Sequence, residues 1–388
     1  MPNPFEDEVA TVGGALDPAA NPFRPGMGRI PPDFGGREPA LRQAKVVVDR
    51  LARRVAPGFI LYRGVRGVGK TALLAYVRQQ ARARDILALH VEADRDDADL
   101  IVARETLLRD AGPLLRTAPD RVLERLAGIK VAGVAVRLRN SGTPASTFET
   151  LIGDVATLAE ATDRGVLLTV DEVHEAGDLL LKPLLRAAHR AAQDDLPLGL
   201  LLSGLPSAAE NLFAEGQTYT ERLHRIDLDL LDRTGTAEAI RGPFARHGAE
   251  VDDLVVDTVH DGSGGYPWFV QLWGEALWDA ARRHDRIELP DARTAGEAVH
   301  TRTEAFFSDR WRRVPTGRAT LLALTLAEQE GDAAMSDLLE VLDLTHQAIA
   351  PARRALIDLG LAWAPSRGRY AFTVPGFDDW ILRHHTDL

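Results

Sequence analysis

Short apolar runs recur through the first 230 residues, with helical patterns between them. The clearest runs lie at residues 59–62, 86–91, 166–170 and 198–202. Strands that are buried on both faces of a parallel sheet have this nearly continuous apolar character. The intervening helical patterns fall at residues 41–55, 72–82, 147–161 and 184–192. Buried strands that alternate with helices predict an α/β fold around a parallel sheet.

The middle of this region is less regular. Helical patterns near residues 97–110 and 119–127 precede residues 131–138, which are rich in β-branched side chains and predict a strand or a hairpin. After about residue 231 the apolar runs give way to amphipathic helical patterns. These lie at residues 234–246, 252–260, 269–283 and 292–311, and they predict an all-α domain.

The C-terminal residues show a third pattern. Helices are expected at residues 318–327, 335–342 and 345–359, followed by short strands at 361–364 and 369–374 and a closing helix at 375–380. Three helices and a hairpin predict a winged helix. Because a helix tolerates proline only in its first turn, Pro351 indicates that the regular part of the third helix begins near Ala350. The expected domains are an extended, Pro- and Gly-rich arm at 1–30, an α/β core at 31–231, a helical domain at 232–314 and a winged helix at 315–388.

Composition and charge exclude several classes of protein. A chain of 388 residues is too long for one core. No window approaches the ~18 consecutive apolar residues of a membrane span, and the N-terminus lacks the pattern of a secretory signal. The absence of cysteine excludes disulfides and thiolate sites, so we expect a cytoplasmic protein. A net charge of −11 excludes a uniformly basic nucleic-acid surface but not a local basic patch.

A glycine-rich segment separates the first apolar run from the helix after it. It contains G-x-x-x-x-G-K-[ST] in the strand–loop–helix context that this phosphate-binding motif requires. Glycine lets successive backbone N–H groups form a concave anion nest at a helix N-terminus. Lys70 would reach the β- and γ-phosphates of a nucleotide, and Thr71 would place its hydroxyl on Mg²⁺. The residues expected to contact the phosphates are Gly64, Val65, Arg66, Gly67, Val68, Gly69, Lys70 and Thr71.

Two acidic residues end the apolar run at 166–170. Asp171 is expected at the carboxyl end of a buried strand, where open α/β sheets bind ligands. Asp171 would hold Mg²⁺ through water, and the next residue, Glu172, would orient and deprotonate the attacking water. An acid at the end of a strand is a weak signal alone, but it is a strong one about 100 residues after a complete phosphate loop. We expect Lys70 and Asp171 to converge on one triphosphate–magnesium unit at adjacent strand tips.

The same acidic segment also matches the DExH box of helicases, since His174 follows at the right spacing. That interpretation requires a Ser-Ala-Thr-like motif and a Gln-x-x-Gly-Arg-x-x-Arg motif, and the chain contains neither. His174 is therefore interpreted as an ordinary residue of the segment after the strand.

The order of motifs resembles the origin-recognition-like and STAND branch of the AAA+ ATPases. Asn21-Pro22-Phe23 and Gly36-Arg37-Glu38 stand ahead of the phosphate loop, as in that branch, where this segment lies over the adenine. The resemblance implies that Arg37 contributes to the nucleotide site and that the bound nucleotide is ATP. No Asn-Lys-x-Asp guanine motif fits the expected strand end. The expected fold is thus an AAA+-like P-loop sheet followed by an all-α lid and a C-terminal winged helix.

Three further roles follow from the resemblance. Ser203, at the tip of the strand after the acidic one, occupies the position of sensor 1, where asparagine is commoner. Arg222, just before an expected strand at 226–230, corresponds to the arginine finger, with Arg225 as the second choice. Gly265-Tyr266-Pro267 matches the GxP motif of STAND lids, in which the proline contacts the base or ribose. Trp268 follows it, so the sensor-2 arginine of many AAA+ proteins is missing.

The expected winged helix leaves two kinds of partner open. In the DNA-reading form, the third helix enters the major groove and arginines of the wing contact phosphates. Nearby aspartates dilute the basic charge, so contact with protein remains an equal alternative. The arginines suited to DNA are Arg353, Arg354, Arg367 and Arg369.

The sequence therefore predicts a protein that binds ATP, hydrolyses it slowly with Mg²⁺ and acts as a nucleotide-controlled switch. Positioning and charge stabilisation supply such catalysis, because phosphoryl transfer needs little covalent chemistry from the protein. One class of partner is double-stranded DNA, as in replication initiation or transposition. The alternative is a STAND-like signalling or defence regulator that contacts protein partners or further copies of itself. A scaffold that holds nucleotide without turnover is a third possibility.

Overall fold

The structure is a computed structural model that describes residues 16–26, 28–93, 105, 109–110, 112, 130–131, 134–135, 144–206, 223–329 and 331–385. It divides into two compact units. One contains Glu38–Val65 and Gly69–Leu228, and the other contains Met1–Arg37, Arg66–Val68 and Asp229–Leu388. They are called the sheet unit and the helical unit below.

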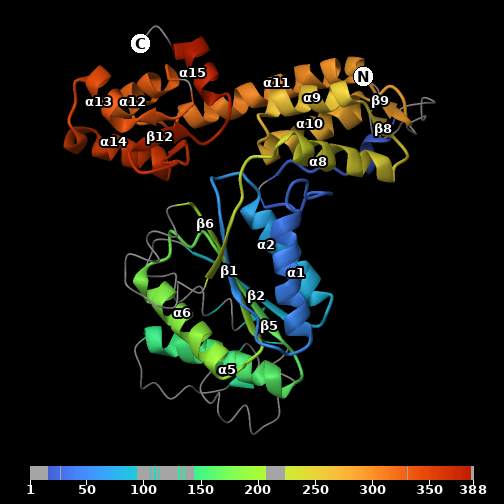
Figure 1. Ribbon diagram of the computed structural model, residues 1–388, viewed down its shortest axis with the longest axis vertical. Coiled ribbons are helices and arrows are strands. Elements are labelled where there is room, and N and C mark those ends of the chain that lie inside the picture. The colour runs from blue at the N-terminus through green and yellow to red at the C-terminus, as the bar shows by residue number, and fades with distance from the viewer. Residues whose placement is uncertain are drawn as a thin grey trace. The chain divides into compact units, whose positions relative to one another are not determined.

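A five-stranded parallel sheet forms the centre of the sheet unit (Figure 1). Its strand order is β2-β5-β6-β1-β7. Every residue of β5 and β6 is buried, which explains their largely apolar sequences. The strands are β1 (Phe59–Arg63), β2 (Leu87–Glu92), β5 (Val166–Asp171), β6 (Leu198–Gly204) and β7 (Leu223–Asp227).

Helices cover both faces of this sheet (Figure 1). On one face lie α1 (Glu38–Ala52) and α2 (Lys70–Arg82), which pack on each other and on the central strands. On the other lie α5 (Pro144–Ala161) and α6 (Asp178–Gln193), whose buried side chains join the core of the sheet. A short antiparallel hairpin, β3 (Lys130–Val131) and β4 (Val134–Ala135), confirms the hairpin expected near residue 131. The observed α/β architecture confirms the predicted fold class.

Residues 233–311 of the helical unit form four helices and one short parallel pair of strands. The helices are α8 (Arg233–Arg246), α9 (Asp253–Ser263), α10 (Pro267–Ala280) and α11 (Leu289–Trp311). The strands are β8 (Glu250–Val251) and β9 (Arg286–Ile287). Asp232 caps α8 by accepting a hydrogen bond from Gly235 N at 2.7 Å, and Glu288 with Asp291 forms a capping box at α11.

The described part of the N-terminal arm packs into these helices after a 3₁₀ turn, η1 (Pro18–Ala20). Phe23 is buried, and its ring lies 5.4 Å from that of Phe244. A Cβ at Gly274 would lie 2.2 Å from the Phe23 ring, so glycine on α10 makes room for it. Asn21 Nδ2 donates to Glu275 O at 3.1 Å and fixes the chain just before the aromatic ring.

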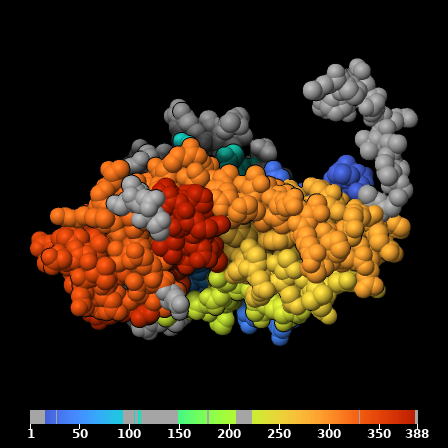
Figure 2. All heavy atoms as spheres, turned by 90° about the horizontal axis from the view of Figure 1, so that it is seen from above, coloured from blue at the N-terminus to red at the C-terminus, as the bar shows by residue number. Residues whose placement is uncertain are grey.

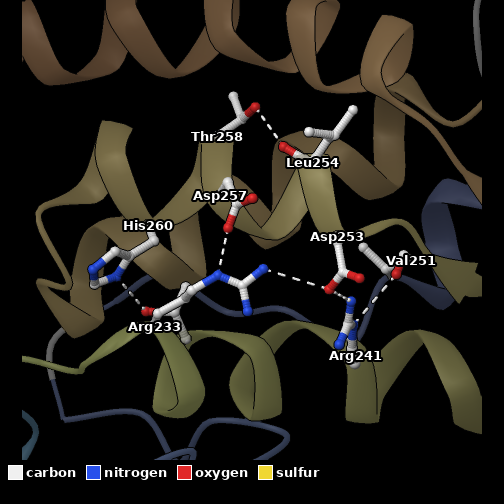
Figure 3. Close-up of polar contacts among 9 residues, drawn as sticks. Arg233, Arg241, Val251, Asp253, Leu254, Asp257, Thr258 and His260 are labelled. Atoms are coloured by element: carbon white, nitrogen blue, oxygen red, sulfur yellow. Dashed lines mark hydrogen bonds and ion pairs between the residues drawn. The ribbon is translucent and has the colours of Figure 1, made fainter.

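Surface ion pairs link α8 to α9 (Figure 3). Arg233 Nε donates to Asp257 at 2.5 Å, and Arg241 Nη2 donates to Asp253 at 2.7 Å. Both arginines approach Asp253, and their hydrogen bonds lower the pKa of that carboxyl. Exposed pairs of this kind add little stability, so the buried apolar core holds the two helices together.

The C-terminal part contains three helices and a small sheet. The helices are α12 (Arg318–Ala327), α13 (Met335–Leu342) and α14 (His346–Asp358). The strands β10 (Ala333–Ala334), β11 (Ala362–Trp363) and β12 (Arg369–Phe372) form an antiparallel sheet in the order β10-β12-β11. The closing helix is α15 (Phe377–His385). Figure 2 shows α12–α15, in orange to red, beside the helices of residues 233–311, in yellow to orange.

One hydrophobic core runs through the helical unit. Between α11 and α15, the rings of Phe307 and Phe377 lie 5.3 Å apart. Trp380 Nε1 donates to Glu304 at 2.7 Å, which satisfies the indole N–H at this junction. The two groups of helices therefore form one compact body.

Two expected boundaries are wrong. α14 begins at His346 and contains Pro351 in its interior, because Thr345 caps the helix by accepting a hydrogen bond from Ala348 N at 3.3 Å. The helix then lacks only the hydrogen bond that an N–H of residue 351 would make. β7 begins at Leu223, three residues before the expected start, so Arg225 lies within the strand and pairs in register with Leu61. Among the described residues, no helix has the length and apolar character to cross a membrane.

Candidate nucleotide-binding site

The phosphate loop follows β1 and leads into α2. Gly64 N donates to Gly204 O at 3.2 Å, which ties the start of the loop to the end of β6. Gly67 and Gly69 have φ values of +87° and +96°, a region that side-chain-bearing residues rarely adopt. Gly69 is the N-cap of α2, so the unpaired N–H groups of this helix end face the loop. The backbone therefore has the form of an anion nest.

Lys70 is turned back into its own loop. Its ammonium group donates to Gly64 O at 2.8 Å and to Val65 O at 2.9 Å, and the residue is only 5% exposed. Carbonyl oxygens thus compensate a buried cation at the mouth of the nest. Thr71, the next residue, is exposed at the first turn of α2, so its hydroxyl is accessible to a ligand.

The tip of the loop, Arg66–Val68, clusters with the helical unit. Tyr266 Oη donates to Arg66 O at 3.2 Å. A Cβ at Gly67 would lie 1.7 Å from the same hydroxyl, so glycine is required there for close approach as well as for its φ. Sequence reasoning missed Tyr266. Its position inside the Gly-x-Pro motif was the available signal.

The Gly-x-Pro motif acts locally as a rigid helix start. Pro267 is the first residue of α10 and Tyr266 is its N-cap. Gly265 has φ +67°, and a Cβ there would lie 2.0 Å from Leu231 O. Leu231 N donates to Gly265 O at 2.7 Å. These contacts fix the backbone that aims the Tyr266 ring.

Arg37 is buried beside the loop tip. Its guanidinium donates to Val68 O at 3.2 Å and to Asp229 O at 2.5 Å. Burial lowers the pKa of Arg37, while the nearby Asp229 and Asp232 act in the opposite direction. The described contacts of Arg37 thus fasten the N-terminal segment to the loop and to residue 229.

Asp171 stands at the end of β5 and is 2% exposed. Its Oδ1 accepts hydrogen bonds from Ser203 Oγ and from Glu172 N, the latter at 2.9 Å. Its other oxygen, Oδ2, accepts no hydrogen bond from the described residues. The expected metal ligand and the expected sensor are therefore in direct contact, and one carboxylate oxygen stays available for a ligand.

The strand order corrects one expectation. β5 and β1 are not adjacent, because β6 lies between them. Ser203 on β6 pairs in register with Tyr62 on β1 and bonds to Asp171 on β5. With a strand spacing of ~4.8 Å, the ends of β5 and β1 lie about 10 Å apart at the same sheet edge.

A tight turn follows Asp171. Glu172 adopts φ +51°, which is uncommon for a residue with a side chain. Val173 N donates to Ser203 O at 2.8 Å, and Leu205 N donates to His174 Nδ1 at 3.3 Å. His174 Nδ1 also lies 3.3 Å from Glu172 Oε2, and its Nε2 lies 3.3 Å from Glu175 Oε1. His174 therefore touches the residue expected to activate water.

A second polar group lies on the sheet face next to Asp171. His90 Nδ1 on β2 is 2.9 Å from Thr169 Oγ1 on β5, and Arg78 Nη1 on α2 donates to the same oxygen at 3.3 Å. Burial, reinforced by the charge of Arg78, lowers the pKa of His90 to about 4. His90 is consequently neutral at physiological pH.

The remaining predicted residues fall into two groups. Arg222 lies outside the described residues, and Arg225 is exposed on the edge strand β7. Arg369 forms a bidentate pair with Asp332, and Arg354 lies 3.7 Å from Asp358. Arg353 and Arg367 are exposed, and their side chains make no ion pair within the part of the chain that the structure describes.

Comparison with known proteins agrees with this geometry. Residues 33–205 match the family model of the AAA ATPase domain, and residues 304–381 match that of a domain of unknown function, DUF8462. No curated protein matches the chain. A solved Walker-type ATPase of Pyrococcus abyssi, PABY2304, has a similar fold, with a TM-score of 0.57 and 14% identity over 91% of this chain and 97% of that chain.

Two further solved structures also match over most of their length. Cdc6p from Pyrobaculum aerophilum gives a TM-score of 0.49 at 12% identity, covering 94% of this chain and 96% of that chain. The Orc1 protein of Aeropyrum pernix, solved in complex with DNA, gives 0.46 at 18% identity, covering 92% and 94%. The parallel sheet, the phosphate loop and the family match define a P-loop ATPase fold. The family match assigns residues 33–205 to the AAA ATPase domain.

Proposed function

We propose that this protein binds ATP, hydrolyses it slowly with Mg²⁺ and works as a nucleotide-controlled switch. The observation that carries the proposal is the group formed by Asp171, Ser203 and Glu172 at the sheet edge from which the phosphate loop emerges. A buried carboxylate is costly in free energy unless it is paired, and a magnesium ion bound to a triphosphate would supply that partner.

Each residue has a defined task in this proposal. The amides of residues 64–71 and Lys70 bind the phosphates, and Lys70 leaves the carbonyls of Gly64 and Val65 to do so. Glu172 orients and deprotonates the attacking water. Ser203 holds Asp171 in place. Pro267 and Arg37 would contact the base or the ribose, and Arg222 would supply the finger.

The oxygen atoms that the candidate site offers are suitable ligands for a magnesium ion. Protein sites for Mg²⁺ commonly use one or two carboxylates together with substrate phosphates and water. The open Oδ2 of Asp171 and the exposed hydroxyl of Thr71 provide oxygen ligands of that kind. The metal would supply charge neutralisation between the β- and γ-phosphates.

The switch follows from how the loop tip is held. Tyr266 and Arg37, both of the helical unit, bond to the carbonyls of Arg66 and Val68. A rearrangement of the loop on nucleotide binding must strain or break these bonds. Nucleotide therefore shifts the population of conformations available to the helical unit, by as much as its affinities for those conformations differ.

The first experiment measures ATP binding and turnover separately. Lys70→Ala should weaken ATP binding at least tenfold, while Glu172→Gln should keep binding and lose turnover by roughly 10²-fold or more. Lys45→Ala, on the exposed face of α1, is the matched control. Unchanged turnover in Glu172→Gln would show that Glu172 is not the base. A wild-type chain that ignores ATP altogether would end the proposal.

The finger is tested by protein concentration. If Arg222 acts on the nucleotide of a neighbouring copy, specific activity should rise with concentration and Arg222→Ala should abolish the rise. Constant specific activity would instead assign the finger to the same chain. Self-association in the presence of ATP would support the first arrangement.

For the partner, we infer that the C-terminal part is a winged helix that contacts double-stranded DNA. Its element order, three helices with a three-stranded antiparallel sheet, supports this. Arg353 on α14 and Arg367 in the turn before β12 are exposed and make no ion pair with a described residue, whereas Arg354 and Arg369 are partly neutralised by Asp358 and Asp332.

DNA binding makes a quantitative prediction about salt. Replacing both Arg353 and Arg367 with alanine should reduce the slope of log affinity against log salt by about 2, since each phosphate contact contributes roughly 0.9. Assembly on ATP that is insensitive to salt, without affinity for duplex DNA, would instead favour a regulator that contacts protein partners.

A further inference from the structure

Beside the residue proposed to activate water stands an imidazole that the proposed reaction does not use. His174 follows Glu172 by two positions, and its side chain is only 6% exposed. Its contacts with described residues include Glu172, Glu175 and the backbone of Leu205 beyond β6. A buried histidine with contacts on both ring nitrogens is held in one orientation.

The backbone contact sets the tautomer. Leu205 N donates to His174 Nδ1, so Nδ1 carries a lone pair and the ring proton belongs on Nε2. Nε2 lies 3.3 Å from Glu175 Oε1, within ion-pair distance but without hydrogen-bond geometry. The ring is thus oriented from both sides, by an amide of the segment after β6 and by an acid of its own turn.

The orientation of the ring determines which of its atoms faces the Glu172 carboxylate. Glu172 Oε2 lies 3.3 Å from the same Nδ1, which presents a lone pair rather than a proton. The buried ring therefore fills the space behind the carboxylate and keeps it from folding back into the turn.

The turn itself links this arrangement to the metal site. Glu172 N donates to Asp171 Oδ1, and Val173 N donates to Ser203 O. With the bond from Leu205 N to His174, two connections join the turn to the end of β6 on either side of Gly204. The uncommon φ of +51° at Glu172 is sustained by these connections.

We propose that His174 is a positioning residue for the hydrolytic reaction: its imidazole, fixed by Leu205 and Glu175, holds the Glu172 carboxylate in the place from which it activates water. This inference rests on the proposed ATPase function. It assigns to His174 an effect on turnover and none on nucleotide binding, because none of the ring's described contacts is with the phosphate loop or Asp171.

The test compares kcat and KM for ATP with Mg²⁺, together with the ATP dissociation constant and Tm, in the full chain. His174→Ala should lower kcat about tenfold, a fraction of the ~10²–10⁴-fold that a general base contributes. KM and the dissociation constant should stay within about twofold, because binding interactions are intact. His284→Ala, an exposed histidine in the helical unit, is the matched control.

Two conservative variants separate positioning from simple packing. Asparagine places a polar atom near Nδ1, where it accepts the Leu205 N–H, whereas glutamine places one near Nε2. His174→Asn should therefore recover most of kcat and His174→Gln much less. Glu175→Gln, which keeps size and hydrogen bonding, should lower kcat only a few fold. Both amide variants are smaller perturbations than alanine and keep the test open if His174→Ala fails to fold.

Three results would overturn the inference. These are an unchanged kcat in His174→Ala, a loss of kcat matched by an equal loss of ATP affinity and Tm, or equal activity of the Asn and Gln variants. A wild-type chain that binds ATP but never hydrolyses it would remove the inference along with the proposed hydrolysis. That outcome is recognised in the wild-type assay, before any His174 variant is compared.

Discussion

Ser203 Oγ donates a hydrogen bond to Asp171 Oδ1 across two neighbouring strands of the sheet. Both residues are buried, with relative exposures of 0% and 2%. The bond occupies one carboxylate oxygen and leaves the other for a metal. It also explains why serine serves at this position, since a short hydroxyl reaches a carboxylate on the next strand.

Ser203→Ala should therefore weaken the response to magnesium. Losing the donor frees Asp171 to rotate and leaves a buried acceptor less satisfied, at a cost to stability of about 1–3 kcal/mol. The Mg²⁺ concentration for half-maximal ATPase activity should rise several-fold, and kcat should fall about tenfold. Ser203→Thr, which keeps the hydroxyl, is the control. An unchanged magnesium dependence in the alanine variant would contradict the assigned role.

Gly67→Ala should disrupt the loop tip for two reasons. The new Cβ would meet Tyr266 Oη at 1.7 Å, and the residue would have to keep a φ of +87°. We expect ATP affinity to fall at least tenfold and Tm to fall by a few degrees. Tyr266→Phe removes the hydroxyl but keeps the ring. If the clash dominates, the double variant should recover part of the affinity lost in Gly67→Ala. No recovery would assign the whole effect to backbone strain.

His90 should make stability depend on pH. Its pKa of about 4 in the folded protein lies below the ordinary 6.5, so the unfolded chain binds more protons between these values. The free energy of unfolding should therefore be fully supported above pH 6.5 and fall as the pH drops toward 4. The loss is on the order of 2 kcal/mol. His90→Asn should flatten this part of the profile in chemical denaturation. An identical slope in both proteins would show that His90 does not titrate there.

Asp154 on α5 should act in the opposite sense. Burial raises the pKa of Asp154 to about 6 from 3.8, so the folded protein binds the extra proton and loses stability as the pH rises through this range. Asp154→Asn should raise the free energy of unfolding at pH 7.5 by about 1–2 kcal/mol and change little at pH 4. Because this window overlaps that of His90, each variant must be compared with the wild type at every pH. A destabilised Asn variant at pH 7.5 would contradict the expected gain.

Local sequence patterns were enough for most of the fold. The strands at residues 59, 166 and 198 were evident from nearly continuous apolar runs, because a strand buried on both faces has no solvent-exposed side. The helices α12 and α13 were predicted at their observed bounds. The sequence did not predict boundaries that depend on a single capping residue or on the pairing partner of a strand. Examples are the start of α14 after Thr345 and the start of β7 at Leu223.

The features of the candidate site also fall into those that the sequence predicts and those that depend on the tertiary structure. By itself the sequence determined the phosphate loop and the acidic pair Asp171-Glu172, because their chemistry depends on residues that are neighbours in the chain. Only the tertiary structure decided that β6 lies between β5 and β1, that Ser203 bonds to Asp171, that Tyr266 and Arg37 hold the loop tip, and that His174 faces Glu172. Most of these contacts join residues tens to hundreds of positions apart, and strand order and helix packing bring them together. Even the short-range contact at His174 depends on Leu205 of another strand to orient its ring.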